Sequence, residues 1–272
     1  MNEQVLIDAQ GRKIPRVIWN ANAPIAQMVL VHGFAEHYRP YSEFAKKLNQ
    51  ANITVQAFDL PGHGLAEGLR CHIDSFQDYL GNLQGFIQQI ESDLPLFLFG
   101  HSMGGLISGH YAIQNSAQLK GLILSSPLTG FDGVSMQLMG ALGRWLNQKY
   151  PTKSMPKLFN PKELSNLEER WPQYQSDPLR GQTITPSMFV SMLDWAQLLH
   201  KNAHLLTLPL LTFYSKADRV VSPSGIERFF AATKSRDKEL VAFTESGHEI
   251  LQSREEPQMT QKLIHWIINR LK

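Results

Sequence analysis

Short, continuously apolar segments alternate with longer amphipathic segments along most of the chain. Segments that are apolar at every position are typical of strands covered on both faces, whereas apolar residues at every third or fourth position indicate helices. The pattern predicts strands at Met28–Val31, Val55–Phe58, Leu96–Phe99 and Leu122–Leu124, and helices near Ser42–Gln50, Phe76–Ile90 and Met103–Gln114. Such alternation produces right-handed crossovers, so we expect an α/β fold with a mostly parallel sheet and helices on both faces.

Both ends of the chain extend this pattern. Gln4–Ile7 and Arg16–Trp19 flank a turn-prone stretch and predict an antiparallel hairpin at the N-terminus. Near the C-terminus, Leu210–Tyr214 and Glu239–Phe243 predict two further strands, and Gln258–Leu271 predicts a closing amphipathic helix.

The alternation is interrupted between Ser126 and Leu210. The interruption is about 80 residues long, whereas a βαβ unit needs only about 30. Its composition also differs, since five of the nine methionines lie between Leu128 and Leu205. We therefore expect an insertion at residues 127–207, placed within a core formed by residues 1–126 and 208–272.

One part of this insertion has an apolar stripe at helical spacing. The stripe consists of Val134, Leu138, Ala141, Leu142 and Trp145. Such spacing is equally consistent with packing in a core and with a surface that faces lipid. The sequence leaves both interpretations open.

Composition narrows the class of protein. The chain has 272 residues, of which 43% are hydrophobic, so a large core is available. Its net charge is +2 without long runs of one sign, which argues against nucleic acid as a partner. The single cysteine, Cys71, excludes an internal disulfide and a cysteine-based metal site.

Two further absences bear on localisation. No apolar run reaches the roughly 18 residues of a spanning helix. The segment Met1–Arg12 carries acids and amides instead of the basic start and apolar stretch of an export signal. We expect a cytoplasmic protein that uses no metal or other cofactor.

The clearest chemical signal is Gly100-His101-Ser102-Met103-Gly104, which directly follows one predicted strand and opens a predicted helix. In a strand–turn–helix setting this pattern lifts the serine above the sheet edge, and the small flanking residues let chain segments pass close by. Ser102 is therefore the candidate nucleophile.

A serine hydroxyl needs a base and a group that orients the base. His248 follows the last predicted strand, at the sheet edge where ligands gather, whereas His265 lies in the apolar closing helix. Asp218 follows the preceding predicted strand by a few residues, which completes the chain order Ser, Asp, His. The rival acid, Asp132, is better placed as the N-cap of the first insertion helix.

Acyl transfer also requires hydrogen-bond donors for the developing oxyanion. The backbone N–H of the residue after the nucleophile, Met103, supplies one donor. We expect the second from the loop after Met28–Val31, where Gly33 permits a sharp turn and Phe34 offers its N–H.

Taken together, these motifs resemble the serine aminopeptidase-like branch of the α/β-hydrolases, which includes monoacylglycerol lipases and bacterial lysophospholipases. The resemblance covers nearly the whole chain. It rests on His32-Gly33-Phe34-Ala35-Glu36-His37, Asp59-Leu60-Pro61-Gly62-His63-Gly64, Gly100-His101-Ser102-Met103-Gly104-Gly105, Ser125-Ser126-Pro127-Leu128, Ala217-Asp218 and Gly247-His248.

This resemblance implies the triad Ser102, Asp218 and His248, with Phe34 and Met103 as the oxyanion hole. It further implies that residues 127–207 form a helical cap, and that Glu36 and His37 lie near the polar head of the substrate.

The function implied is a serine carboxylester hydrolase that cleaves single-acyl-chain lipid esters, either monoacylglycerol or lysophospholipid, through an acyl-enzyme on Ser102. The partner expected is a small lipid or ester substrate, with transient contact between the cap and a membrane surface. In one departure from the family, Pro40 rather than an arginine precedes Tyr41, and Arg39 is one position earlier.

Two alternatives stay open. An aminopeptidase of the same branch would need cap acids to hold a free amine, and the candidates are Glu163, Glu168, Glu169, Asp177 and Asp194. The spacing of these acids is typical of solvated helix faces. A non-catalytic binding protein on the same fold is the second alternative, although the complete set of Ser, Asp, His and oxyanion loops argues against it.

Overall fold

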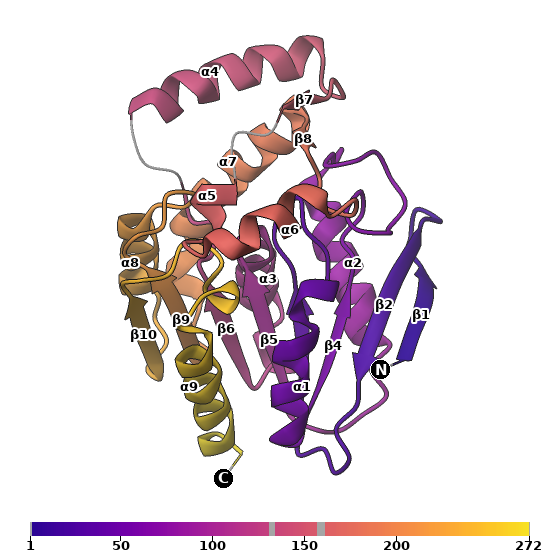
Figure 1. The fold of residues 1–272 in the computed structure, drawn as a ribbon, viewed down its shortest axis with the longest axis vertical. Helices are drawn as coiled ribbons and strands as arrows, with labels where there is room; N and C mark the ends of the chain where they lie inside the picture. Colours follow the sequence, from indigo (N-terminus) through magenta and orange to yellow (C-terminus); the bar gives the residue numbers. More distant parts are fainter. Residues whose placement is uncertain (1, 131–133, 157–160, 272) are drawn as a thin grey trace.

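The structure, a computed structural model, describes residues 2–130, 134–156 and 161–271 (Figure 1). Its centre is an eight-stranded sheet in the order β1-β2-β4-β3-β5-β6-β9-β10. The strands are β1 (Asn2–Ile7), β2 (Lys13–Trp19), β3 (Ala26–Val31), β4 (Ile53–Phe58), β5 (Leu96–His101), β6 (Gly121–Ser125), β9 (Leu210–Ser215) and β10 (Lys238–Phe243). β2 pairs antiparallel with β1 and β4, and the other pairings in this sheet are parallel.

Helices cover both faces of the sheet, as Figure 1 shows. One face carries α1 (Ser42–Gln50) and α9 (Glu256–Asn269), and the other carries α2 (Phe76–Gln88), α3 (Met103–Gln114) and α8 (Pro223–Ala232). The mostly parallel α/β fold expected from the sequence is confirmed.

The continuously apolar strands fill two cores at once. Met28 and Leu30 of β3 belong to the cluster under α1 and α9, whereas Val29 and Val31 belong to the cluster under α2 and α3. Because successive side chains of a strand point to opposite faces, a strand between two helical layers must be apolar at every position.

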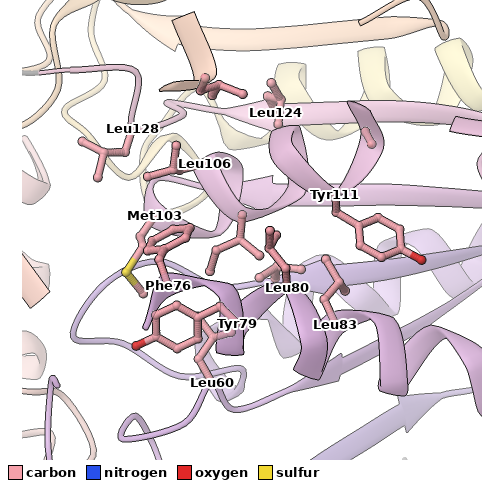
Figure 2. Packing of buried hydrophobic residues seen from close by; sticks show 14 of the residues in the cluster. Leu60, Phe76, Tyr79, Leu80, Leu83, Met103, Leu106, Tyr111, Leu124 and Leu128 are labelled. Atoms are coloured by element: carbon pink, nitrogen blue, oxygen red, sulfur yellow. The ribbon is translucent and has the colours of Figure 1, made fainter. Parts of the chain in front are cut away.

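The packing of α2 on α3 illustrates how apolar residues at helical spacing form one buried face (Figure 2). Phe76, Tyr79, Leu80 and Leu83 are buried on one side of α2, at the spacing of one helix face. Ser75 caps this helix, since its side chain accepts a hydrogen bond from the backbone N–H of Gln77. The helix therefore begins where its apolar face begins.

Most predicted elements are confirmed with small changes at their ends, including the hairpin formed by β1 and β2. The sequence analysis missed α8. Its signal is Ser222, whose side chain caps the helix by accepting from the N–H of Gly225, followed by Pro223 in the first turn.

The described part of the chain between β6 and β9 contains two long helices, several short ones and a small second sheet. These elements are α4 (Val134–Lys149), β7 (Met155–Pro156), α5 (Pro161–Leu164), η3 (Glu168–Arg170), α6 (Trp171–Ser176), β8 (Thr183–Ile184), α7 (Pro186–Asn202) and η4 (Ala203–Leu205). Figure 1 shows α4 as the outermost element, with α7 between α4 and the main sheet. Asp132 lies outside the described residues.

The described side chains of the apolar stripe on α4, which begin at Leu138, face outward. Leu138 is 71% exposed, Leu142 is 56% exposed and Trp145 is 54% exposed. The opposite side of α4 packs on α7, where Gly143 lies beside the ring of Phe189. Of the two interpretations of the stripe, core packing is wrong for these three side chains.

We predict that Gly104→Ala destabilises the protein by about 2 kcal/mol or more, because overpacking a buried site forces the backbone to shift. A methyl group on Gly104, in α3, would lie 2.1 Å from the carbonyl oxygen of Val31 in β3. The matched control is Gly85→Ala in α2, where nothing lies within 4 Å of the added carbon. The control should stabilise the helix by roughly 0.5–1 kcal/mol. Urea unfolding of the two variants checks the prediction, and similar midpoints would contradict it.

Candidate active site

Ser102 lies at the turn between β5 and α3 with φ 51° and ψ −117°. Such a conformation is costly for a residue with a side chain, so surrounding contacts must impose it. Its N–H donates to the carbonyl of Ser125 at 3.0 Å, and its own carbonyl accepts from Leu106 at 3.1 Å and from Leu128 at 2.9 Å. These backbone bonds hold the serine at the end of the strand.

Glycines on both sides of the turn allow this geometry. A carbon added to Gly100 would lie 2.4 Å from the carbonyl oxygen of Gly104, and Gly104 itself is in close contact with β3. The Gly-x-Ser-x-Gly spacing is therefore a requirement of chain packing around Ser102.

Asp218 follows β9, His248 follows β10, and their side chains are in direct contact. Nδ1–H of His248 donates to Oδ2 of Asp218 at 2.8 Å, and both side chains are buried. The other carboxylate oxygen accepts from the N–H groups of Val220 at 2.8 Å and Val221 at 3.0 Å. Because Nδ1 is engaged with the acid, Nε2 is the nitrogen available to accept a proton.

The two groups shift each other's protonation. Burial alone raises the pKa of Asp218, but the charge and hydrogen bond of His248 bring the net pKa below its ordinary value. Burial likewise lowers the pKa of His248, but Asp218 more than compensates, so the net pKa of His248 is above 6.5. The shifts suit the roles expected for the pair, an ionised acid and a histidine that accepts a proton more readily.

His32 holds the loop expected to form the oxyanion hole. Its Nε2 accepts from the N–H of Leu60 at 2.9 Å, so its Nδ1–H donates to the carbonyl of Gly33 at 2.8 Å. Burial lowers the pKa of His32 well below its usual value, which keeps the ring neutral in this role. The loop lies directly against the candidate nucleophile, since a carbon added to Gly33 would be 3.2 Å from Cβ of Ser102.

The two expected oxyanion donors lie on this loop and at the helix start. Phe34 follows Gly33 and lines the same cavity as Ser102. Met103 is the first residue of α3, where backbone N–H groups have no acceptor within the helix.

Ser102 and His248 line a cavity of about 580 Å³, a volume that includes space open to solvent. Its apolar wall comes from Phe34, Leu128, Leu164, Met192 and Val220, and its polar wall from Glu36, His101, Arg180 and Glu249. Among the methionines of the insertion that the structure describes, Met192 lines this wall. Trp195 instead stacks on Phe76 outside the cavity, with ring centroids 4.8 Å apart.

The polar wall is a buried cluster of charges. Two nitrogens of the Arg180 guanidinium donate to the two carboxylate oxygens of Glu249 at 3.0 and 3.2 Å. Tyr174 O–H also donates to Glu249, at 2.7 Å, and Tyr41 O–H donates to Glu36. Burial, followed by the charge of Glu249, raises the pKa of Glu36 to about 7.

Of the two residues that the sequence analysis assigned to the substrate head, the structure places only one in the cavity. Glu36 lines the cavity, whereas Nε2 of His37 lies 2.8 Å from Oδ2 of Asp177 and His37 does not line it. Arg39 is exposed, and the cation near Glu36 is Arg180 of the insertion.

The sequence analysis missed Arg180, Tyr174 and Glu249. Glu249 had a signal, since it directly follows His248 in the chain. Arg180 had none, because an arginine in an insertion without a motif cannot be placed from sequence.

The fold and this site define a serine hydrolase of the α/β-hydrolase class. The profile of the family described as serine aminopeptidase, S33, matches residues 22–256, and the chain belongs to this family. The family expected from the motifs is confirmed.

Individual relatives agree with this assignment. The chain is 29% identical to a monoglyceride lipase of Rattus norvegicus over 98% of this chain and 90% of the relative. It is 27% identical to phospholipase YtpA of Bacillus subtilis over 85% of this chain and 91% of that protein. A crystal structure of Paleococcus ferrophilus monoacylglycerol lipase superposes with a TM-score of 0.87 at 30% identity, covering 94% and 99% of the two chains.

We predict that ester hydrolysis falls as the pH drops through the pKa of His248, because a protonated imidazole cannot take the proton of Ser102. Since Asp218 holds this pKa above 6.5, the acid limb of kcat/KM should have its midpoint above pH 6.5. The measurement is kcat/KM for a p-nitrophenyl ester between about pH 5 and about pH 9. A rate that stays constant down to about pH 4 would exclude a histidine base.

Proposed function

We propose that the protein is a carboxylester hydrolase that cleaves lipid esters with one acyl chain and a small, neutral polyol head, as in a monoacylglycerol. The observation that carries this proposal is the cavity itself. The cavity that Ser102 and His248 line also contains apolar side chains suited to an acyl chain and polar side chains suited to hydroxyl groups. The named activities of the relatives support the same substrate class.

The proposed reaction assigns one role to each of these side chains. Oγ of Ser102 attacks the ester carbonyl while His248 takes its proton, and Asp218 keeps His248 in the required tautomer. The N–H groups of Phe34 and Met103 stabilise the oxyanion of the tetrahedral intermediate. His248 then gives its proton to the departing alcohol, and water hydrolyses the acyl-enzyme on Ser102 by the same route in reverse.

The charges of the polar wall favour a neutral head over a phosphodiester. Arg180 is already neutralised by both oxygens of Glu249, so this cation is not available to balance a phosphate. Glu36, with a pKa of about 7, can accept or donate hydrogen bonds to hydroxyl groups near neutral pH. The charges of the site therefore support a lysophospholipid less well than a monoacylglycerol as the substrate.

An aminopeptidase has less support from the same cavity. None of Glu163, Glu168, Glu169, Asp177 and Asp194 is among the described residues that line it. Asp177 is hydrogen-bonded to His37, and Asp194 forms an exposed ion pair with Arg144.

In this proposal, residues 127–207 act as a cap on a core of residues 1–126 and 208–272. The exposed Leu138, Leu142 and Trp145 on α4 would rest on a membrane surface, from which a lipid could enter the cavity. Among the described residues, no helix combines the length and apolar character that a bilayer crossing requires. The location proposed is the cytoplasm, at the periphery of a membrane.

We predict that Ser102→Ala and His248→Ala each lower kcat by about 10⁶-fold, and that the double variant loses little more, because the triad acts as a unit. Asp218→Asn should lower kcat by roughly 10⁴-fold by stabilising the wrong tautomer of the histidine. Hydrolysis of p-nitrophenyl butyrate and labelling by a fluorophosphonate probe are the measurements. Losses that multiply in the double variant would refute the triad, and failure of the native protein to label would favour a binding protein.

We also predict that monooleoylglycerol is hydrolysed faster than emulsified trioleoylglycerol, because the cavity can enclose one acyl chain but not three. Burial of each CH₂ contributes about 0.8 kcal/mol, so kcat/KM should rise by up to about fourfold per CH₂ until the cavity is filled. A panel of monoacylglycerols, lysophospholipids and aminoacyl-naphthylamides tests the head group. Faster turnover of trioleoylglycerol would contradict the enclosed site, and preference for an aminoacyl amide would indicate a peptidase.

A further inference from the structure

The loop that carries His248 runs from β10 to a short 3-10 turn, η5 (Ile250–Gln252), and is held from two sides. From the core, Ser126 Oγ–H donates to the carbonyl of His248 at 2.9 Å, and Ser215 Oγ–H donates to the carbonyl of Ser246 at 2.6 Å. These bonds fix the side of the loop that faces the sheet.

The other side of the loop is held by the insertion. The N–H of Glu249 donates to the carbonyl of Leu164 at 2.9 Å, and Asn166 Nδ2–H donates to the carbonyl of Glu245. A carbon added to Gly247 would lie 2.8 Å from the same Leu164 oxygen, so the two backbones are in direct contact.

The side chain of Glu249 completes this attachment. Both of its oxygens are bound by groups of the insertion, namely the guanidinium of Arg180 and the hydroxyl of Tyr174. The guanidinium also stacks on the Tyr174 ring, 4.3 Å from its centroid. Arg180 and Glu249 are buried, with side chains 5% and 6% exposed, so removal of either partner would leave the other charge buried without compensation.

The segment that carries Arg180 also contacts the loop of the oxyanion hole. The N–H of Gly181 donates to the carbonyl of Ala35 at 3.0 Å, and the carbonyl of Leu179 accepts from Arg70 at 2.8 Å. A side chain on Gly181 would collide with Sγ of Cys71, so this close approach requires glycine. One short segment, residues 177–181, therefore touches the loops of both the base and the oxyanion donors.

We propose that Arg180 and Tyr174 are positioning residues for the catalytic base, acting through Glu249 to hold the His248 loop in its reactive place. The inference rests on the proposed function, because it requires His248 to be the base. It goes beyond that function by making the reactive geometry of the core depend on the docked state of residues 174–181. Loss of either contact weakens the attachment of the Glu249 side chain and gives the adjacent imidazole more freedom to move relative to Ser102.

The test uses p-nitrophenyl acetate, whose short acyl group and aromatic leaving group need neither the acyl wall nor a polyol site. Arg180→Met should lower kcat by about 10- to 100-fold with little change in KM, since a small misplacement of a catalytic group costs about this much. Arg180→Lys should recover part of the loss, because lysine keeps the charge but not the two-pronged geometry. Tyr174→Phe, which removes one hydroxyl, should lower kcat by up to about tenfold.

Two variants control for general effects on the insertion. Arg144→Met removes an exposed cap ion pair with Asp194, and Tyr150→Phe removes the hydroxyl of a tyrosine that is 53% exposed. Both controls should keep the native kcat. Thermal unfolding of every variant separates a loss of folded protein from a loss of turnover, and Tyr174→Phe decides the matter if Arg180→Met does not fold.

Three outcomes would overturn the proposal, and they are distinguishable. Native kcat in folded Arg180→Met and Tyr174→Phe, with lower thermal stability alone, would reduce both residues to a structural role. A loss confined to KM for monooleoylglycerol, with p-nitrophenyl acetate turnover unchanged, would make Arg180 a head-group ligand. Failure of the native protein to hydrolyse any ester would remove the proposed function itself.

Discussion

Ser102 holds a backbone conformation that its side chain disfavours, and hydrogen bonds with β6, with the loop after β6 and with α3 keep it there. Strain of this kind costs about 1–3 kcal/mol and persists only where the surroundings over-determine it. The same contacts bring the backbones of β3, β5, β6 and α3 so close together that only glycine fits between them. The glycines that flank Ser102 and the position of the cavity beside it are therefore consequences of one turn that must be both tight and rigid.

A second constraint is electrostatic. The cavity places two carboxylates, Glu36 and Glu249, beside a histidine in a region with little water. Arg180 holds the pKa of Glu249 below its ordinary value, while Glu36 is left with a raised pKa. A buried ion pair of this kind contributes little net stability, but loss of one partner leaves an uncompensated charge. The pair is better explained by the geometry that it imposes than by the free energy that it adds.

Much of the fold could be predicted because its causes are local. The strands could be predicted because a strand between two helical layers has no polar face. Ser102 could be predicted because its turn requires glycines at a fixed spacing. Arg180 could not be predicted, because its role depends on a contact between the insertion and a loop about 70 residues away in sequence, and no periodicity encodes such a contact. The outward direction of Leu142 was equally hidden, since an amphipathic pattern does not say whether its apolar face meets protein or solvent.

The helix α7 gives the insertion a second role. Its first turns carry Met192 into the cavity wall, but Ala196 and Leu199 further along are buried in the same cluster as the core strands. The helix also carries the chain back to the start of β9, so it serves as the crossover that a parallel sheet requires between β6 and β9. The insertion is consequently not a separable module. An exchange of the segment between β6 and β9 with another member of this family would preserve the core only if the graft ended before α7, and natural divergence would be expected to accumulate in the part that precedes it.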